Sequence, residues 1–247
     1  MTIKVAVVGA LGRMGRTVCT AVEGAPDMEL VARLDVGDEI TERTLAGADV
    51  AVEFTVPATT EANVHALLKA GVDVVVGTTG WTDEALEGVR AAAEATSRSV
   101  IIAPNYALSA VLAMSFAEKA ATYFESVEVI ELHHPDKVDA PSGTAATTAR
   151  KISEVRRAAG VAVSPDATET DPLGARGAKV DDVRVHAVRL RGLNAHEEIL
   201  LGNPGEQLTI RQDSFDRSSF MPGVLLAVRE VGGRGGLTYG LDVVMGL

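Results

Sequence analysis

The stretch that decides the fold reads KVAVVGALGRMG and runs from Lys4 to Gly15. Its first half is an apolar run typical of a buried strand, and its second half places Gly9, Gly12 and Gly15 at the start of a helical segment. Glycine lets the chain turn sharply, so that backbone N–H groups approach a pyrophosphate at the positive end of the following helix. The spacing is GxxGxxG where the commonest dinucleotide fingerprint has GxGxxG. Its place in the first βαβ unit favours dinucleotide binding over a plain strand-to-helix turn.

The residues after this turn repeat the same alternation of strand and helix. We predict strands at residues 4–8, 29–34, 50–54, 72–76 and 100–103, and helices at residues 16–23, 61–70 and 84–95. Such alternation is typical of βαβ units around a buried parallel sheet. Residues 1–106 are therefore expected to form an α/β domain with a Rossmann-like, doubly wound parallel sheet, whose ligands bind at the carboxyl ends of the strands.

Asp35 ends the second predicted strand, about twenty residues after Gly15, where a carboxylate can accept hydrogen bonds from the ribose hydroxyls of NAD. The alternative interpretation is a solvated acid at a strand end. NADP would place a phosphate against the charge of Asp35, although Arg13 in the glycine turn could reach and neutralise it. The residues alone therefore leave the choice between NADH and NADPH open.

The pattern changes in the second half of the chain. A predicted helix at 107–124 is followed by a strand at 127–132, a helix at 144–159, a polar loop at 161–179, and strands at 183–190, 197–201 and 207–212. The turn-forming segments Gly192-Leu193-Asn194 and Asn203-Pro204-Gly205 join the last three strands and indicate an antiparallel sheet. We expect residues 107–216 to form a second, α+β domain with an open, mostly antiparallel sheet.

The tail, residues 217–247, returns to a helix at 218–230 and a strand at 237–241, and is expected to complete the first domain. Its glycine run at 232–236 has the composition of a flexible linker.

Composition narrows the class of partner. The formal net charge of -11 opposes nucleic-acid binding, which needs a basic face against phosphates. Apolar runs fall short of the roughly 20 residues of a membrane span, and no secretory cleavage site follows the first strand. We therefore expect a cytoplasmic protein with a small-molecule ligand. The single cysteine, Cys19, is expected only to pack within a helix.

The densest chemistry lies in the segment ELHHPDKVDAPSGT, residues 131–144, between a strand and a helix. His133 and His134 can exchange protons near neutral pH, and Lys137 can supply a cation or a proton; a site that reduces an imine or enamine acid could use both. A zinc site that combines the histidines with Asp136 or Asp139 is the rival interpretation, and a surface loop without function is another.

Ser142 is predicted to be the N-cap of the following helix, which leaves the next amides free to bind a carboxylate. A glycine at position 143 is not needed for a cap, and relief of crowding is the alternative reason for it.

Taken together, the segments GALGRMG, EFTVPATTEANV, GTTGW, APNY and ELHHPDKVDAPSGTA resemble the dihydrodipicolinate reductase family, also named 4-hydroxy-tetrahydrodipicolinate reductase. The resemblance spans essentially the whole chain in order, and the HHxxKxDAPSGTA string is its most specific part. It implies reduction of 4-hydroxy-tetrahydrodipicolinate to tetrahydrodipicolinate by NADH or NADPH, in diaminopimelate and lysine biosynthesis. Hydride transfer to C4 and protonation of the neighbouring carbon are implied as well.

The resemblance also implies roles for individual residues. His133 matches the catalytic proton donor or acceptor and Lys137 the second proton donor. The positions that match substrate-binding residues are His134, Ser142, Gly143 and Thr144. Those that match cofactor contacts are Gly9, Ala10, Leu11, Gly12, Arg13, Met14, Asp35, Gly77, Thr78, Thr79, Ala103, Pro104, Asn105 and Tyr106. Further implications are a homotetramer, a role of residues 107–216 in substrate binding and oligomerisation, and closure of the two domains; no metal is implied.

Two departures from the family pattern bear on these expectations. Pro135 and Asp136 stand where many relatives have basic residues, which affects the charge balance for the substrate. No arginine follows Asp35, as it often does in enzymes that use NADP. A reductase of a different substrate and a non-enzymatic dinucleotide sensor are the competing hypotheses. The histidine and lysine segment argues against both.

Overall fold

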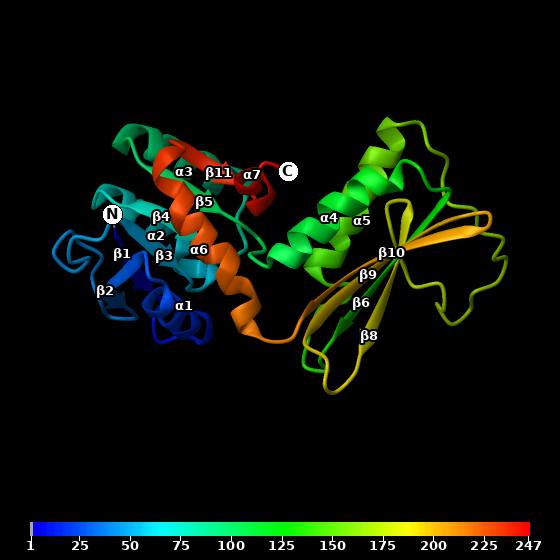
Figure 1. Cartoon of the computed structure of the whole chain (residues 1–247), viewed down its shortest axis with the longest axis horizontal. Helices are drawn as coiled ribbons and strands as arrows, with labels where there is room; N and C mark the ends of the chain where they lie inside the picture. Colours follow the sequence, from blue (N-terminus) through cyan, green and yellow to red (C-terminus); the bar gives the residue numbers. More distant parts are fainter. Residues whose placement is uncertain (1) are drawn as a thin grey trace. The chain divides into compact units, whose positions relative to one another are not determined.

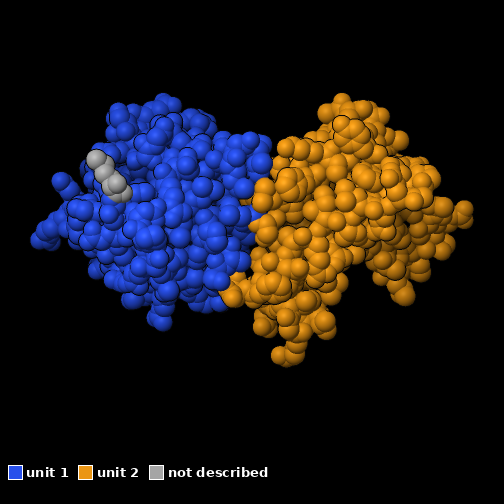
Figure 2. Space-filling model, viewed as in Figure 1, with its two compact units in different colours: residues 1–108, 217–247 blue, residues 109–216 orange. Residues whose placement is uncertain are grey.

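The computed structural model describes residues 2–247, which divide into two compact units (Figure 2). Unit 1 contains the described residues up to Leu108 together with Arg217–Leu247, and unit 2 contains Ser109–Asp216. No helix within residues 2–247 combines the length and the apolar character that crossing a membrane requires.

Unit 1 is built on a six-stranded parallel sheet with the order β11-β5-β4-β3-β1-β2 (Figure 1). The strands are β1 (Ile3–Val8), β2 (Met28–Leu34), β3 (Val50–Glu53), β4 (Asp73–Val76), β5 (Ser99–Ile102) and β11 (Gly236–Tyr239). The order reverses at β1, because β2 pairs with one of its edges and β3 with the other. This reversal makes the sheet doubly wound, as the sequence predicted, and it leaves a crevice between the carboxyl ends of β1 and β3.

The helices of unit 1 are α1 (Arg13–Gly24), α2 (Pro57–Lys69), α3 (Asp83–Thr96), α6 (Met221–Glu230) and α7 (Leu241–Met245), with 3₁₀ turns η1 (Arg217–Phe220) and η2 (Val231–Gly233). Within these layers α2 packs beside α3 and α1 packs beside α6. Helices α1 and α2 begin three and four residues earlier than predicted. In α2 the cause is Pro57, because proline at the first helical position has its backbone dihedral already set for a helix.

Strand side chains form the core of unit 1. Val5, Val7 and Val75 are fully buried on one face of the sheet, and Ala6 and Val74 on the other. The glycine run at 232–236 is not a flexible linker, contrary to the prediction from composition. It forms η2 and the first residue of β11, and the Gly235 N–H donates to the Ser99 hydroxyl at 3.0 Å. Pairing with the edge of the sheet therefore orders this segment.

Unit 2 has a five-stranded sheet with the order β10-β9-β6-β8-β7. Its elements are α4 (Leu108–Ala121), β6 (Ser126–His133), α5 (Gly143–Ala158), β7 (Ala178–Val180), β8 (Val183–Arg189), β9 (Ala195–Asn203) and β10 (Glu206–Ser214). Both α4 and α5 lie over one face of this sheet (Figure 1). Val127 and Val129 of β6 and Ile199 and Leu201 of β9 are buried beneath these helices. The sheet is mostly antiparallel, with one parallel pair, β6 and β8.

The turn chemistry predicted one of the two strand connections correctly. Asn203-Pro204-Gly205 lies at the β9–β10 turn, and these strands are antiparallel neighbours. The segment Gly192-Leu193-Asn194 reverses the chain, but β8 and β9 are not neighbours because β6 lies between them. A turn signal indicates that the chain reverses its direction. It does not indicate which strand lies between the two strands that the turn joins, and here that strand, β6, comes from earlier in the chain. Strand β7 was not predicted either, since it begins inside the predicted polar loop.

Candidate active site

The glycine turn lies at the carboxyl end of β1, in unit 1. Gly9 has a φ of +82°, and a Cβ atom there would lie 2.2 Å from the Phe54 carbonyl oxygen. A Cβ atom on Gly15 would lie 2.0 Å from the carbonyl oxygen of Gly9, so both positions exclude any side chain. Gly12 is the N-cap of α1 and supplies no side-chain cap. The first-turn N–H groups of this helix therefore remain available for a phosphate.

Asp35 lies beside this turn. Its Oδ2 accepts a hydrogen bond from the Leu11 N–H at 2.7 Å, and its Oδ1 accepts one from the Val36 N–H at 2.9 Å. These backbone donors, with Val36 contributing most, hold the pKa of Asp35 below its usual value. A cavity of about 440 Å³ adjoins Asp35, Gly9, Gly12 and Thr55. Asp35 is thus an ionised group at the edge of the crevice.

The remaining predicted cofactor residues follow β4 and β5, at the same edge of the sheet. The Thr78 hydroxyl donates to Glu53 at 2.8 Å, and the Tyr106 hydroxyl donates to the Val76 carbonyl oxygen at 2.8 Å. Burial also raises the pKa of Tyr106. The hydroxyl groups of Thr78 and Tyr106 therefore donate hydrogen bonds within the protein. We expect a ligand to contact the backbone of these segments instead.

Glu53 is a residue that the sequence analysis missed. This carboxylate ends β3 fully buried and accepts hydrogen bonds from Thr60 and Thr78 at 2.8 Å, from Asn63 at 3.2 Å and from Thr55. It ties together the segments that follow β3 and β4. The signal in the sequence was an acid at the end of the otherwise apolar strand VAVE.

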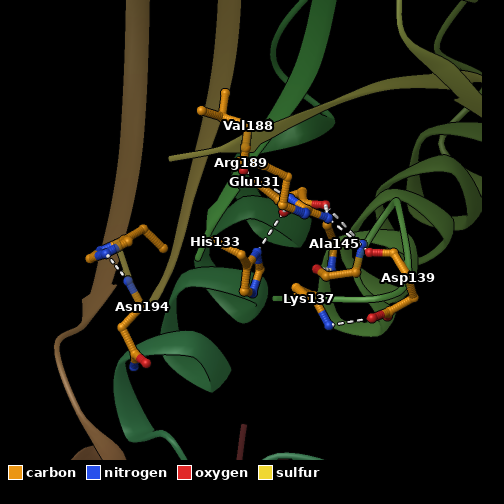
Figure 3. A network of polar contacts seen from close by, with 10 residues as sticks. Glu131, His133, Lys137, Asp139, Ala145, Val188, Arg189 and Asn194 are labelled. Carbon is orange, nitrogen blue, oxygen red and sulfur yellow. Dashed lines mark hydrogen bonds and ion pairs between the residues drawn. The ribbon is translucent and has the colours of Figure 1, made fainter. Parts of the chain in front are cut away.

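In unit 2, a buried carboxylate holds His133 (Figure 3). Glu131 on β6 is fully buried, and its Oε2 lies 2.5 Å from Nδ1 of His133. Burial lowers the pKa of His133, although the bond to Glu131 works in the opposite direction. At neutral pH the ring is therefore uncharged, with its hydrogen on Nδ1 and directed to Glu131. The lone pair on Nε2 is then the part of the ring able to accept a proton.

Arg189 on β8 completes this cluster. Its guanidinium donates to both oxygens of Glu131, at 2.7 and 2.8 Å. Burial alone would raise the pKa of Glu131, but the bonds from Arg189 and His133 more than offset it, so that the pKa is lowered. Glu131 is therefore an anion at neutral pH. No role for Arg189 was predicted from the sequence, because the pattern did not indicate the parallel pairing of β8 with β6 that brings Arg189 to His133.

Lys137 lies in the loop after β6. Its Nζ contacts Asp139 Oδ1 at 2.6 Å, which lowers the pKa of Asp139 (Figure 3). The Lys137 N–H also donates to the His134 carbonyl oxygen at 3.2 Å, in the turn that joins the two residues. The side chains of Lys137 and His134 are partly exposed, so both are accessible to a ligand.

The start of α5 adjoins the same carboxylate. The Ser142 hydroxyl accepts a hydrogen bond from the Ala145 N–H at 3.2 Å, which confirms the predicted N-cap. The Ser142 N–H donates to Glu131 at 3.1 Å, so that the cap is fixed to the His133 cluster. A Cβ atom on Gly143 would meet nothing within 4 Å, and relief of crowding therefore does not explain this glycine. Its open surface leaves room for a ligand beside the first-turn amides.

Comparison with known proteins bears on this arrangement directly. Residues 3–106 match the family described as dihydrodipicolinate reductase, N-terminus, and residues 109–245 match the C-terminus of the same family. The chain belongs to the dihydrodipicolinate reductase family. The resemblance drawn from the motifs is thereby confirmed. As a member of this family the chain is an oxidoreductase, and its N-terminal Rossmann domain binds NAD(P).

Named relatives are similar over their full length. The chain is 64% identical to the 4-hydroxy-tetrahydrodipicolinate reductase of Beutenbergia cavernae and 58% identical to that of Nocardia farcinica, with 100% of both chains covered in each case. Among solved structures, dihydrodipicolinate reductase from Paenisporosarcina sp. TG-14 with bound dipicolinate matches with a TM-score of 0.88 at 40% identity. That match covers 98% of this chain and 99% of the other.

Proposed function

We propose that this chain reduces 4-hydroxy-tetrahydrodipicolinate to tetrahydrodipicolinate with NADH or NADPH, a step in diaminopimelate and lysine biosynthesis. The full-length relatives carry this activity in their names. The observation that carries the proposal is the cluster in unit 2, in which the buried Glu131 fixes both His133 and the N-terminus of α5. Proton exchange and carboxylate binding are thus available side by side.

The substrate is a cyclic dicarboxylate, and the start of α5 suits one of its carboxylates. We assign this contact to Ser142, Gly143 and Thr144, with His134 as a further substrate-binding residue. Helix-start amides and the positive end of the helix dipole attract an anion. Lys137 adds a local positive charge, which a protein with a net charge of -11 needs in order to bind a dianion.

Proton transfer divides between two residues. Lys137 is the cation of the segment, and we assign it the delivery of a proton to the ring carbon beside C4. The C4 hydroxyl of the substrate has to leave as water before C4 can accept a hydride. His133 is neutral and presents the Nε2 lone pair, so we assign it the transfer of the proton from the ring carbon beside C4 to the departing hydroxyl. Glu131 stabilises the imidazolium that results, as an ionised carboxylate within hydrogen-bond distance does.

Unit 1 is suited to the dinucleotide, which supplies the hydride when it is bound. The backbone of Gly9, Ala10, Leu11, Gly12, Arg13 and Met14 is assigned to the pyrophosphate. The segments 77–79 and 103–106 are assigned further contacts at the same edge of the sheet. Asp35 is assigned the ribose hydroxyls. Its ionised carboxylate favours the unphosphorylated ribose of NADH, while the exposed Arg13 is the residue available to a phosphate of NADPH.

The family resemblance motivates three further proposals about the whole protein. Residues 1–106 with 217–247 serve as the dinucleotide-binding domain, and residues 107–216 serve in substrate binding and oligomerisation. Four chains assemble through the sheets of unit 2, whose second face is not covered by α4 and α5. The enzyme works in the cytoplasm, where its cofactor and substrate are made.

A direct assay tests the activity. Purified protein is mixed with the fresh product of pyruvate and aspartate-semialdehyde condensation, and nicotinamide absorbance is followed with NADH and NADPH in parallel. Rapid, substrate-dependent oxidation is the expected result, and the ratio of the two rates gives the cofactor preference. If folded protein oxidises neither cofactor, the proposed function is wrong.

A further inference from the structure

A buried carboxyl group that the proposed reaction does not use lies next to the His133 cluster. Glu197 on β9 is 4% exposed, and its Oε1 atom has no hydrogen-bond partner among residues 2–247. Its carboxyl contacts the Thr148 hydroxyl of α5. A buried carboxylate is ordinarily satisfied by a cation or by several donors. One neutral hydroxyl is a poor environment for an anion and an adequate one for a protonated acid.

Strand register explains why this group bears on the site. Glu197 pairs directly with Glu131 of β6 and with Gln212 of β10, and directly paired residues share a face with Cβ atoms about 5 Å apart. Glu131 and Gln212 therefore lie directly opposite Glu197, Thr148 contacts it from α5, and His133, two residues beyond Glu131 on the same face of β6, is its diagonal neighbour. The Arg189 guanidinium is bound to both oxygens of Glu131. Because this cation stabilises the charge of Glu131, Glu197 is the carboxyl group of the two that favours the protonated form.

We propose that Glu197 is a positioning residue that carries a proton in the active enzyme, so that Glu131 is the single buried anion and orients His133. The inference rests on the proposed function, because it assigns proton exchange to His133. In the neutral form the carboxyl O–H of Glu197 donates to the Thr148 hydroxyl. The Thr148 hydroxyl in turn donates to the Thr144 carbonyl oxygen at 3.1 Å, within the first turn of α5.

Loss of this proton would disturb both partners. An ionised Glu197 places a second negative charge opposite Glu131, and it draws the Thr148 hydrogen away from Thr144. Burial, reinforced by the charge of Glu131, raises the pKa of Glu197 to about 7, so that ionisation falls within the working range of the enzyme. We therefore expect kcat/KM of the wild type to fall as the pH rises through neutrality.

The test is a pair of pH profiles of kcat/KM, for the wild type and for Glu197→Gln. Glutamine keeps the shape of the neutral acid and cannot ionise. At about pH 6 the two proteins should agree within about 2-fold, and the alkaline limb of the variant should lie about 1 pH unit higher. An unshifted limb would overturn the inference. So would a loss of about 10-fold or more at every pH in a folded variant, because the carboxylate itself would then be required.

Glu198→Gln is the matched control. Glu198 is the next residue along β9, points to the other face of the sheet and pairs with Arg211, and its variant should keep the wild-type profile. Infrared difference spectra supply a readout without turnover. A protonated-carboxyl stretch should disappear as the pH is raised and should be missing from Glu197→Gln. If the wild type had no reductase activity, the proposed function would fail, while this band would still report on Glu197. Absence of the band would overturn the inference.

Discussion

The glycine turn of unit 1 and the His133 cluster of unit 2 each place the start of a helix beside a carboxylate, but they hold that carboxylate in different ways. In the turn, the Leu11 and Val36 backbone N–H groups hold Asp35 at its border. The cluster relies on side chains, and its anchor, Glu131, is an anion with no exposure to solvent. On the proposed function, we therefore expect changes beside the turn to alter cofactor affinity and changes in the side-chain cluster to alter turnover.

Lys137→Ala is the change with the largest expected effect. Loss of a positioned proton donor should lower kcat by about 10²- to 10⁴-fold, because that contribution exists only in the transition state. The dissociation constant for NADH, measured by fluorescence titration, should change by less than about 2-fold. Lys179→Ala is the control, since Lys179 is an exposed lysine of the same unit that pairs weakly with Asp182. Full turnover in Lys137→Ala would remove Lys137 from the mechanism.

Glu131→Gln should lower both the free energy of unfolding and the rate of turnover. Arg189 would lose its carboxylate, which we expect to cost roughly 2 kcal/mol in chemical denaturation, because the partly exposed guanidinium retains water. The folded pKa of Glu131 is lowered, so its contribution to stability is complete above the usual value of 4.5 and is lost as the pH falls through the folded value. Glu131→Gln should not show this loss of stability at acid pH. Equal acid sensitivity in the two proteins would show that Glu131 is not the group responsible.

Asp35→Asn tests the other region. The amide oxygen can still accept from the Leu11 N–H, while the charge beside the ribose site is removed. We expect KM for NADH to rise about 10-fold, as for a lost hydrogen bond to a charged group, with kcat nearly unchanged. The ratio of NADPH to NADH efficiency should increase, because the repulsion of a phosphate is gone. A fall in kcat with constant KM values would contradict the division between the two regions.

The smallest effects are expected from the removal of two matched helix caps, one in each unit. Thr82 caps α3 in unit 1 and Ser142 caps α5 in unit 2, each accepting from a backbone N–H at 3.2 Å. Replacement of either by alanine should cost about 1 kcal/mol of unfolding free energy. Only Ser142→Ala should also raise KM for the substrate, since Ser142 is assigned to substrate binding. A similar rise in Thr82→Ala would indicate a general loss of stability.

The same contrast explains what the sequence could predict. The glycine turn and the Ser142 cap depend on residues close together in the chain, and both were predicted. The surroundings of His133 depend on strand order, because β6 inserts between β8 and β9 and brings Arg189 and Glu197 to Glu131. Local turn signals carry no information about that insertion. The glycine run at 232–236 failed for a related reason, since pairing with β5 orders a segment of flexible composition.

Isotope tracing tests the central claim, reduction of the ring at C4, most directly. NADH that carries deuterium at the transferable position of its nicotinamide is incubated with enzyme and fresh condensation product, and the reduced product is examined by NMR. We predict one deuterium at C4 of tetrahydrodipicolinate, with solvent hydrogen at the neighbouring carbon. Deuterium at another ring carbon, or a product without deuterium, would contradict it.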